Sequence, residues 1–312
     1  MKTLILGAAG FIGTNLALCL RDNPENELAL VDKNKSYFIP TLQKDRSLQI
    51  MESTFDDTTD FDTLLQGQEI VYHLVSTTVP TTSNQHISQE LQANVIFSSN
   101  LFEACVRNKV KKVVFISSGG TVYGREADCP LKEKTATNPI SSYGIQKITI
   151  EKLLYLYHYL YGLDYRIIRL ANPYGPYQRP NGVLGAVTTF TYKALRHEKI
   201  TVYGDGSVIR DYIYIDDAIR AMQKIVEGES KHRTFNLGCG EGTSIKKVLE
   251  TIEQVLNVPL EIEYKEGRKV DVPENYLDIS RYEKYYGALN PVSLEEGIQK
   301  TAEFMKQHYC YE

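Results

Sequence analysis

The sequence lacks several features that mark large classes of proteins. Its five cysteines include no C-x-x-C pair and are odd in number: Cys19, Cys105, Cys129, Cys239 and Cys310. We therefore expect free thiols in a reducing cytoplasm, and neither a metal site nor a disulfide framework. The net charge is −4 and there is no run of Lys or Arg, which disfavours a nucleic-acid partner.

Long apolar runs are also missing. The longest ones fall short of the roughly 20 residues that a membrane-spanning helix needs, so we expect no membrane partner. Met1-Lys2 leads directly into an apolar run, which leaves no room for a signal peptide. With 312 residues, the chain is long enough for a nucleotide-binding domain and a smaller second lobe.

Short apolar runs alternate with helical patterns along the first half of the chain. The runs lie at 2–6, 28–31, 70–74, 112–116 and 165–170, and the helical patterns at about 84–108 and 142–161. This alternation predicts an α/β fold with a doubly wound parallel sheet. Later helical patterns lie near 184–197, 216–227, 244–256 and 294–308. We expect a Rossmann domain over 1–172 and a smaller α/β substrate lobe over 173–312, with some later strands returning to the main sheet.

Three glycines follow the first apolar run at the spacing of a dinucleotide-binding turn. Gly7 permits a tight turn, Gly10 lets the backbone approach a pyrophosphate, and Gly13 allows a helix to pack closely on the strand. Phe11 and Ile12 open the helical pattern, whose N-terminal N–H groups and positive dipole end suit phosphates. Strand, glycines and helix together indicate a dinucleotide site.

Asp32 ends the next predicted strand, 19 residues after Gly13. A carboxylate at this place accepts hydrogen bonds from the adenosine ribose hydroxyls and repels a 2′-phosphate. Lys33 and Lys35 lie close by and weaken this preference. We therefore expect NAD rather than NADP as the cofactor.

Tyr143 and Lys147 stand four residues apart in a predicted helix, after a strand that ends in Ser117 and Ser118. At this spacing two side chains share one helix face. Tyrosine titrates near pH ~10 in water, and a nearby ammonium favours its phenolate. Lys147 is therefore expected to lower the pKa of Tyr143 toward the range of a general base. The pattern predicts a base, the cation that activates it and a nearby hydroxyl.

Five segments occur in an order that is found in one enzyme family. They are GAAGFIG at 7–13, SSGGTVYG at 117–124, YGIQK at 143–147, RLANPYGP at 169–176 and GDGSVIRDY at 204–212. Over essentially its whole length the chain resembles the NAD-dependent epimerase/dehydratase family of extended short-chain dehydrogenases/reductases, and most of all UDP-glucose 4-epimerases. The resemblance implies C4 epimerisation of a nucleoside-diphosphate hexose through a transient 4-keto sugar, with a tightly bound NAD.

The resemblance also implies roles for individual residues. Tyr143 takes a proton from the sugar hydroxyl, while Lys147 holds the nicotinamide ribose and tunes the tyrosine. Besides Asp32 and the glycine turn, it implies cofactor contacts for Leu74, Val75, Ser76, Asn94, Ser117, Leu170 and Pro173. It implies substrate contacts for Thr78, Asn172, Arg179, Val183, Tyr203, Arg210, Arg268 and Asp271. Arginine forks match phosphate oxygens, although an ion pair with Asp211 is a simpler role for Arg210.

Gly119 stands where the family usually carries the Ser or Thr that hydrogen-bonds the sugar oxygen. Ser118, Thr121 or a water molecule remain candidates for this task, and we favour Ser118 because it directly adjoins the position. The related 4,6-dehydratases carry an Asp-Glu pair where this chain has Gly120-Thr121. Elimination of water is therefore disfavoured.

Two other functions fit part of the pattern: a net oxidoreductase, such as a reductase of a 4-keto sugar, and a non-catalytic dinucleotide sensor. The Tyr143–Lys147 pair disfavours a sensor, and Asp32 disfavours a reductase that uses NADPH. The family makes a UDP-sugar the expected substrate. Asn275 stands where the family selects between a hexose and its N-acetyl form, and both stay open. A homodimer through the helices at 84–108 and 142–161 is implied as well.

Overall fold

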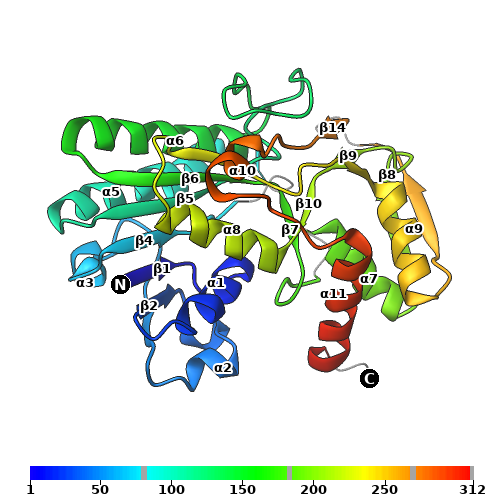
Figure 1. Ribbon diagram of the computed structural model, residues 1–312, viewed down its shortest axis with the longest axis horizontal. Coiled ribbons are helices and arrows are strands. Elements are labelled where there is room, and N and C mark those ends of the chain that lie inside the picture. The colour runs from blue at the N-terminus through cyan, green and yellow to red at the C-terminus, as the bar shows by residue number, and fades with distance from the viewer. Residues whose placement is uncertain (79–82, 181–184, 268–271, 310–312) are drawn as a thin grey trace.

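The structure is a computed structural model that describes residues 1–78, 83–180, 185–267 and 272–309. Its centre is a seven-stranded sheet in which all neighbouring strands are parallel (Figure 1). In spatial order the strands are β11 (Thr234–Leu237), β6 (Asp164–Leu170), β5 (Lys112–Ser118), β4 (Ile70–His73), β1 (Lys2–Leu6), β2 (Glu27–Asp32) and β3 (Gln49–Glu52). The predicted doubly wound sheet is confirmed, and the strand order reverses between β1 and β4.

Side chains alternate along the strands and fill two separate cores. Ile5 of β1 packs into one core, and its neighbours Leu4 and Leu6 pack into the other. The helices are α1 (Phe11–Arg21), α8 (Ile215–Glu227) and α10 (Ser280–Tyr286) on the first face, and α3 (Phe61–Leu65), α5 (Phe97–Arg107) and α6 (Ser142–Tyr161) on the second. Because both faces are covered, the strands are continuous apolar runs in the sequence.

The helix predicted over 84–108 is interrupted. Three consecutive segments take its place: α4 (Ile87–Leu91), the π-helical segment η2 (Gln92–Ile96) and α5. A π-helical turn holds an extra residue and often occurs at functional sites. Asn94 lies within η2, and its side chain bonds the loop that follows β4.

One strand from the second half of the chain completes the main sheet. β11 pairs with β6 at the sheet edge, and α8 packs against α1 beside it. In the first half, η1 (Lys35–Tyr37) and α2 (Pro40–Gln43) connect β2 to β3. The division into two domains at residue 172 stays a prediction.

The other elements of the second half surround a third apolar core. α7 (Ala186–Leu195), α9 (Ile245–Leu256) and α11 (Leu294–His308) pack against one another there (Figure 1). The short strands pair as β7 (Asn172–Tyr174) with β10 (Tyr212–Tyr214), β8 (Ile200–Tyr203) with β13 (Ile262–Lys265), and β9 (Ile209–Arg210) with β12 (Thr243–Ser244) and β14 (Glu274–Asn275). Within the described ranges, no helix is both long and apolar enough to cross a membrane.

Candidate active site

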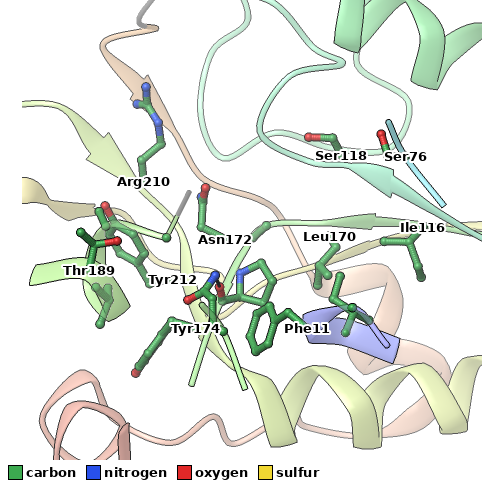
Figure 2. Close-up of a pocket in the computed structure, with 18 of the residues that line it drawn as sticks. Phe11, Ser76, Ile116, Ser118, Leu170, Asn172, Tyr174, Thr189, Arg210 and Tyr212 are labelled. Atoms are coloured by element: carbon green, nitrogen blue, oxygen red, sulfur yellow. Dashed lines mark hydrogen bonds between the residues drawn. The ribbon is translucent and has the colours of Figure 1, made fainter. Parts of the chain in front are cut away.

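A cavity of about 670 Å³ opens where β1, β5 and β6 end, between the main sheet and the short strands of the second half. Ligands of open α/β sheets bind at such a place, outside the carboxyl ends of strands at a topological switch. Most residues expected at the site line it: Gly7, Gly10, Phe11, Ile12, Gly13, Leu74, Ser76, Thr78, Ser117, Ser118, Tyr143, Lys147, Leu170, Asn172, Pro173, Tyr203 and Arg210. Figure 2 shows Ser76 and Ser118 on one side and Arg210 and Asn172 on the other.

The glycine turn forms one end of the cavity. Gly7 has a φ of +82°, and its N–H donates a 2.9 Å hydrogen bond to the Val31 carbonyl. At Gly13, a Cβ would lie 2.4 Å from the Gly7 carbonyl oxygen and 2.7 Å from the Ala8 Cα, so α1 packs here only because residue 13 has no side chain. The turn therefore fits a dinucleotide pyrophosphate at the N-terminus of α1.

Asp32 lies beside this turn, at the end of β2. One carboxylate oxygen accepts a 2.9 Å hydrogen bond from the Ala9 N–H, and the other accepts a 2.8 Å bond from the Lys33 N–H. These bonds fix a negative charge next to the turn. The charge is placed where an adenosine ribose is recognised in folds of this type.

Tyr143 and Lys147 line the cavity from the first turns of α6. Lys147 is 7% exposed, and its Nζ donates a 2.9 Å hydrogen bond to the Ile116 carbonyl while lying 5.4 Å from the centre of the Tyr143 ring. Burial lowers the pKa of Lys147 to about 8, and the Glu151 carboxylate opposes this shift. The charge of Lys147 is therefore sensitive to its surroundings near neutral pH.

The effect of Lys147 on the pKa of Tyr143 stays a prediction. Burial disfavours the phenolate and raises the pKa of Tyr143 to about 12. The Lys147 ammonium bonds a backbone carbonyl and lies 5.4 Å from the centre of the phenol ring.

The start of α6 is held by buried polar contacts. The Ser142 hydroxyl donates to a Glu90 carboxylate oxygen, and Gln146 Nε2 donates to the same oxygen at 3.1 Å. Gln146 Oε1 accepts a 3.2 Å hydrogen bond from the Thr78 hydroxyl, which lines the cavity. These contacts join the helix that carries Tyr143 to the loop after β4.

Asn94 supports the same loop from behind the cavity wall. Its Oδ1 accepts a hydrogen bond from the Thr77 N–H at 2.9 Å, and its Nδ2 donates to the Thr77 hydroxyl at 2.9 Å. The neighbouring residues Ser76 and Thr78 line the cavity. Asn94 therefore acts on the cavity through Thr77 in this structure.

Gly119 is buried against Leu277. A Cβ at residue 119 would lie 2.6 Å from Leu277 Cδ1 and 3.2 Å from the Arg169 carbonyl oxygen. Because Leu277 is fully buried, the space for a Ser or Thr side chain is already filled. Ser118 lines the cavity, while the buried Thr121 hydroxyl makes no hydrogen bond within the described part of the chain.

Arg210 and Asn172 line the cavity from the second half of the chain. Arg210 Nη1 donates 2.7 Å hydrogen bonds to the carbonyl oxygens of Ile209 and Val272, which hold the guanidinium at the wall. Asp211 is fully buried, and its carboxylate accepts backbone N–H bonds from the loop after β11. These residues place a cation and an amide opposite the Ser118 side of the cavity.

Some expected residues lie elsewhere. Among the described residues, five expected ones do not line the cavity: Asp32, Val75, Asn94, Thr121 and Arg179. Arg179 is exposed to solvent, and Val75 is buried in the core of the main sheet. Val183, Arg268 and Asp271 lie outside the described residues. Across the described ranges, no group of His, Cys, Asp and Glu side chains could hold a metal ion.

Several wall residues were not identified from the sequence. They include Gln178, Thr189, Phe190, Val202 and Tyr212. Gln178 Nε2 donates a 3.2 Å hydrogen bond to the Pro173 carbonyl, and its Oε1 accepts from the Thr188 hydroxyl. The only sequence clue to Gln178 is its place in the proline-rich loop that follows the 169–176 segment.

Proteins of known name match the chain over nearly its whole length. The model described as "NAD dependent epimerase/dehydratase family" matches residues 3–238. A UDP-glucose 4-epimerase of Mycolicibacterium smegmatis is 32% identical over 310 residues, 98% of this chain and 99% of that protein. A dTDP-4-dehydro-6-deoxyglucose reductase of Escherichia coli is 33% identical over 310 residues, 95% of each chain.

Solved structures agree with this result. The crystal structure of UDP-glucose 4-epimerase from Thermotoga maritima with UDP-glucose matches with a TM-score of 0.91 and 33% identity. The match covers 98% of this chain and 99% of that one. The glycine turn and the Tyr143–Lys147 pair both lie within the region of the family match. The chain therefore belongs to the NAD-dependent epimerase/dehydratase family.

Proposed function

We propose that this protein is an NAD-dependent nucleotide-sugar 4-epimerase that interconverts UDP-hexoses at C4. One observation carries the proposal: Tyr143 and Lys147 face the same cavity as the glycine turn at the start of α1. A sugar hydroxyl at Tyr143 therefore shares one enclosed space with a dinucleotide held by that turn. The full-length similarity to UDP-glucose 4-epimerases supports the same reaction.

Tyr143 is the proposed base, which takes the proton of the C4 hydroxyl and later gives it back. Bound NAD supplies the reversible hydride acceptor that allows the sugar to pass through a 4-keto form without net oxidation. Because burial raises the pKa of Tyr143 to about 12, this role requires positive charge close to the phenol. Lys147, which lies over the phenol ring, provides such a charge.

The proposed diphosphate contacts are Arg210 and Asn172 on the cavity wall. An N-acetyl group on the sugar is expected to be tolerated, because the Asn275 side chain is buried and does not line the cavity. Asn275 is 2% exposed, and its Nδ2 donates a 3.4 Å hydrogen bond to the Gly120 carbonyl. We therefore expect UDP-glucose, UDP-galactose and their N-acetyl forms as substrates.

A reductase of a 4-keto sugar is the second candidate function. The Escherichia coli relative that carries such a name is as similar to this chain as the epimerases are. A reductase consumes one reduced cofactor for each sugar, whereas an epimerase consumes none. Turnover with sugar alone, without added cofactor, therefore separates the two functions.

We expect Asp32 to set the cofactor preference, with NAD bound much more tightly than NADP. Asp32→Ala should reduce the difference between the affinities for NAD and NADP, because it removes the charge that repels a 2′-phosphate. Asp32→Asn should reduce this difference as well, because it removes the charge while keeping an acceptor for the Ala9 N–H. Titration of both dinucleotides measures the effect, and equal affinities in the unmodified protein would refute this assignment.

We expect Ser118 to take the place of the hydroxyl that Gly119 lacks. Ser118→Ala should lower turnover by about 10²–10³-fold, as does removal of one donor from a developing oxyanion. Thr121→Ala should change turnover little, because its hydroxyl is buried away from the cavity. Steady-state kinetics on both variants measures the effect, and full turnover in both would leave water as the donor.

We further infer a homodimer through α5 and α6. The outer side of α6 exposes large apolar side chains: Ile145, Tyr155, Leu156, Tyr159, Leu160 and Tyr161. Ile96 of the adjoining π-helical segment is also exposed. Contact with a second copy would remove this apolar surface from water, which favours association.

The four described cysteines are free thiols, which suits a reducing cytoplasm.

A further inference from the structure

Glu151 stands one helical turn after Lys147 on α6, as Lys147 stands one turn after Tyr143. This spacing puts the three side chains along one face of the helix. Glu151 is only 5% exposed, which is unusual for a charged residue. A buried carboxylate is costly unless it is paired and hydrogen-bonded, so its partners indicate what it does.

The partners of Glu151 come from two strands. Arg169 Nε and Nη2 donate to the two carboxylate oxygens at 3.0 and 2.6 Å, and the Ser117 hydroxyl donates to Oε1 at 2.6 Å. Ser117 and Arg169 are direct partners in the β5–β6 register. Glu151 therefore fastens α6 to both strands at the point where they end at the cavity.

Lys147, one helical turn before Glu151, also links α6 to β5. Its ammonium bonds the Ile116 carbonyl, one residue before Ser117 on β5. Lys147 and Glu151, on consecutive turns of α6, are thus hydrogen-bonded to the consecutive β5 residues Ile116 and Ser117. Any shift of α6 along β5 would break both ties and move Tyr143 with them.

We propose that Glu151, held in place by Arg169, is a positioning residue for the Tyr143–Lys147 pair: it fixes α6 against β5 and β6 and places a negative charge one helical turn from the Lys147 ammonium. The inference rests on the proposed role of Lys147 beside Tyr143. It also assigns a role to Arg169, which opens the 169–176 segment and is not among the described residues that line the cavity.

The other titratable groups around Lys147 do not supply this charge. On α6, Tyr143 is a phenol, because burial raises its pKa to about 12. On β4, His73 is neutral, because burial lowers its pKa to about 3. On β6, Arg169 is itself a cation. Among the described residues, Glu151 is the carboxylate whose field raises the pKa of Lys147 against the effect of burial.

Glu151→Gln tests the proposal, because it keeps the shape of the side chain and an acceptor for Ser117 but removes the charge. The rate at which acetic anhydride acylates Lys147 is measured against pH on cofactor-free protein by peptide mass spectrometry. The midpoint should fall by about one pH unit or more, the usual effect of losing a close opposite charge. The alkaline limit of turnover should fall with it.

A second variant covers the case in which Glu151→Gln fails to fold, since it leaves Arg169 buried without a counter-charge. Glu151→Gln/Arg169→Met removes both charges and keeps the volume, a replacement that buried ion pairs often tolerate. A smaller downward shift of the Lys147 midpoint than in Glu151→Gln is expected, because the Arg169 cation is lost together with the carboxylate. Asp217→Asn is the control, because Asp217 is a 1% exposed carboxylate on α8 and should leave the midpoint unchanged.

An unchanged midpoint in the folded variants would overturn this inference, even in a protein that epimerises sugars. A lowered midpoint in a protein that epimerises no sugar would uphold the inference and refute the proposed function. The two proposals can therefore fail separately.

Discussion

Tyr143→Phe is expected to lower the turnover of UDP-hexose epimerisation by about 10²–10⁴-fold, the usual loss when a general base is removed. The substitution takes away only the hydroxyl, and the ring can stay 5.4 Å from the Lys147 ammonium. The fold and the bound NAD should therefore be preserved. Turnover, together with the NAD released on denaturation, measures both parts of this prediction.

Tyr157→Phe is a matched control on the same helix. Its hydroxyl lies 3.1 Å from the Ser99 hydroxyl, away from the cavity, so its loss should leave turnover unchanged. Retention of most activity by Tyr143→Phe would show that another group removes the proton.

Gly13→Ala is expected to abolish NAD binding and to destabilise the protein. The added Cβ would lie 2.4 Å from the Gly7 carbonyl oxygen, a backbone atom that no rotamer change can move. The N-terminus of α1 would have to shift away from the turn, and overpacking of this kind costs about 1–3 kcal/mol. Calorimetric titration with NAD and thermal unfolding measure the two effects.

Gly267→Ala serves as the control for this substitution. The atom nearest to its added Cβ is the Gly204 Cα at 3.6 Å, an ordinary van der Waals contact. NAD affinity should therefore be unchanged. A folded Gly13→Ala protein that binds NAD as tightly as the parent would contradict the assigned cofactor site.

The fold was predictable where a local pattern decides the structure. The apolar run at 2–6 and the helical pattern at 142–161 correspond to β1 and α6 as observed. The break within 84–108 was not predictable. It accompanies two hydrogen bonds between Asn94 and Thr77, one donated by each residue, and these join the helix to the loop after β4. β3 was missed because its sequence, QIME, is short and partly polar at the sheet edge.

The site was predictable where spacing alone carries the chemistry. Tyr143 and Lys147 share a helix face by their spacing, and the glycines form the turn by theirs. The raised pKa of Tyr143 depends on burial by the whole fold, which the spacing does not contain. The filling of the space beside Gly119 by Leu277 depends on a loop from the other end of the chain, and so does the buried position of Asn275.

Epimerisation at C4 without net redox change is tested most directly by incubating the purified protein with a panel of UDP- and dTDP-sugars, without added cofactor. The products are resolved by NMR. Interconversion of UDP-glucose with UDP-galactose, or of their N-acetyl forms, toward equilibrium with no accumulation of NADH is the predicted result. Net NADH, or a stable 4-keto or decarboxylated product, would contradict it.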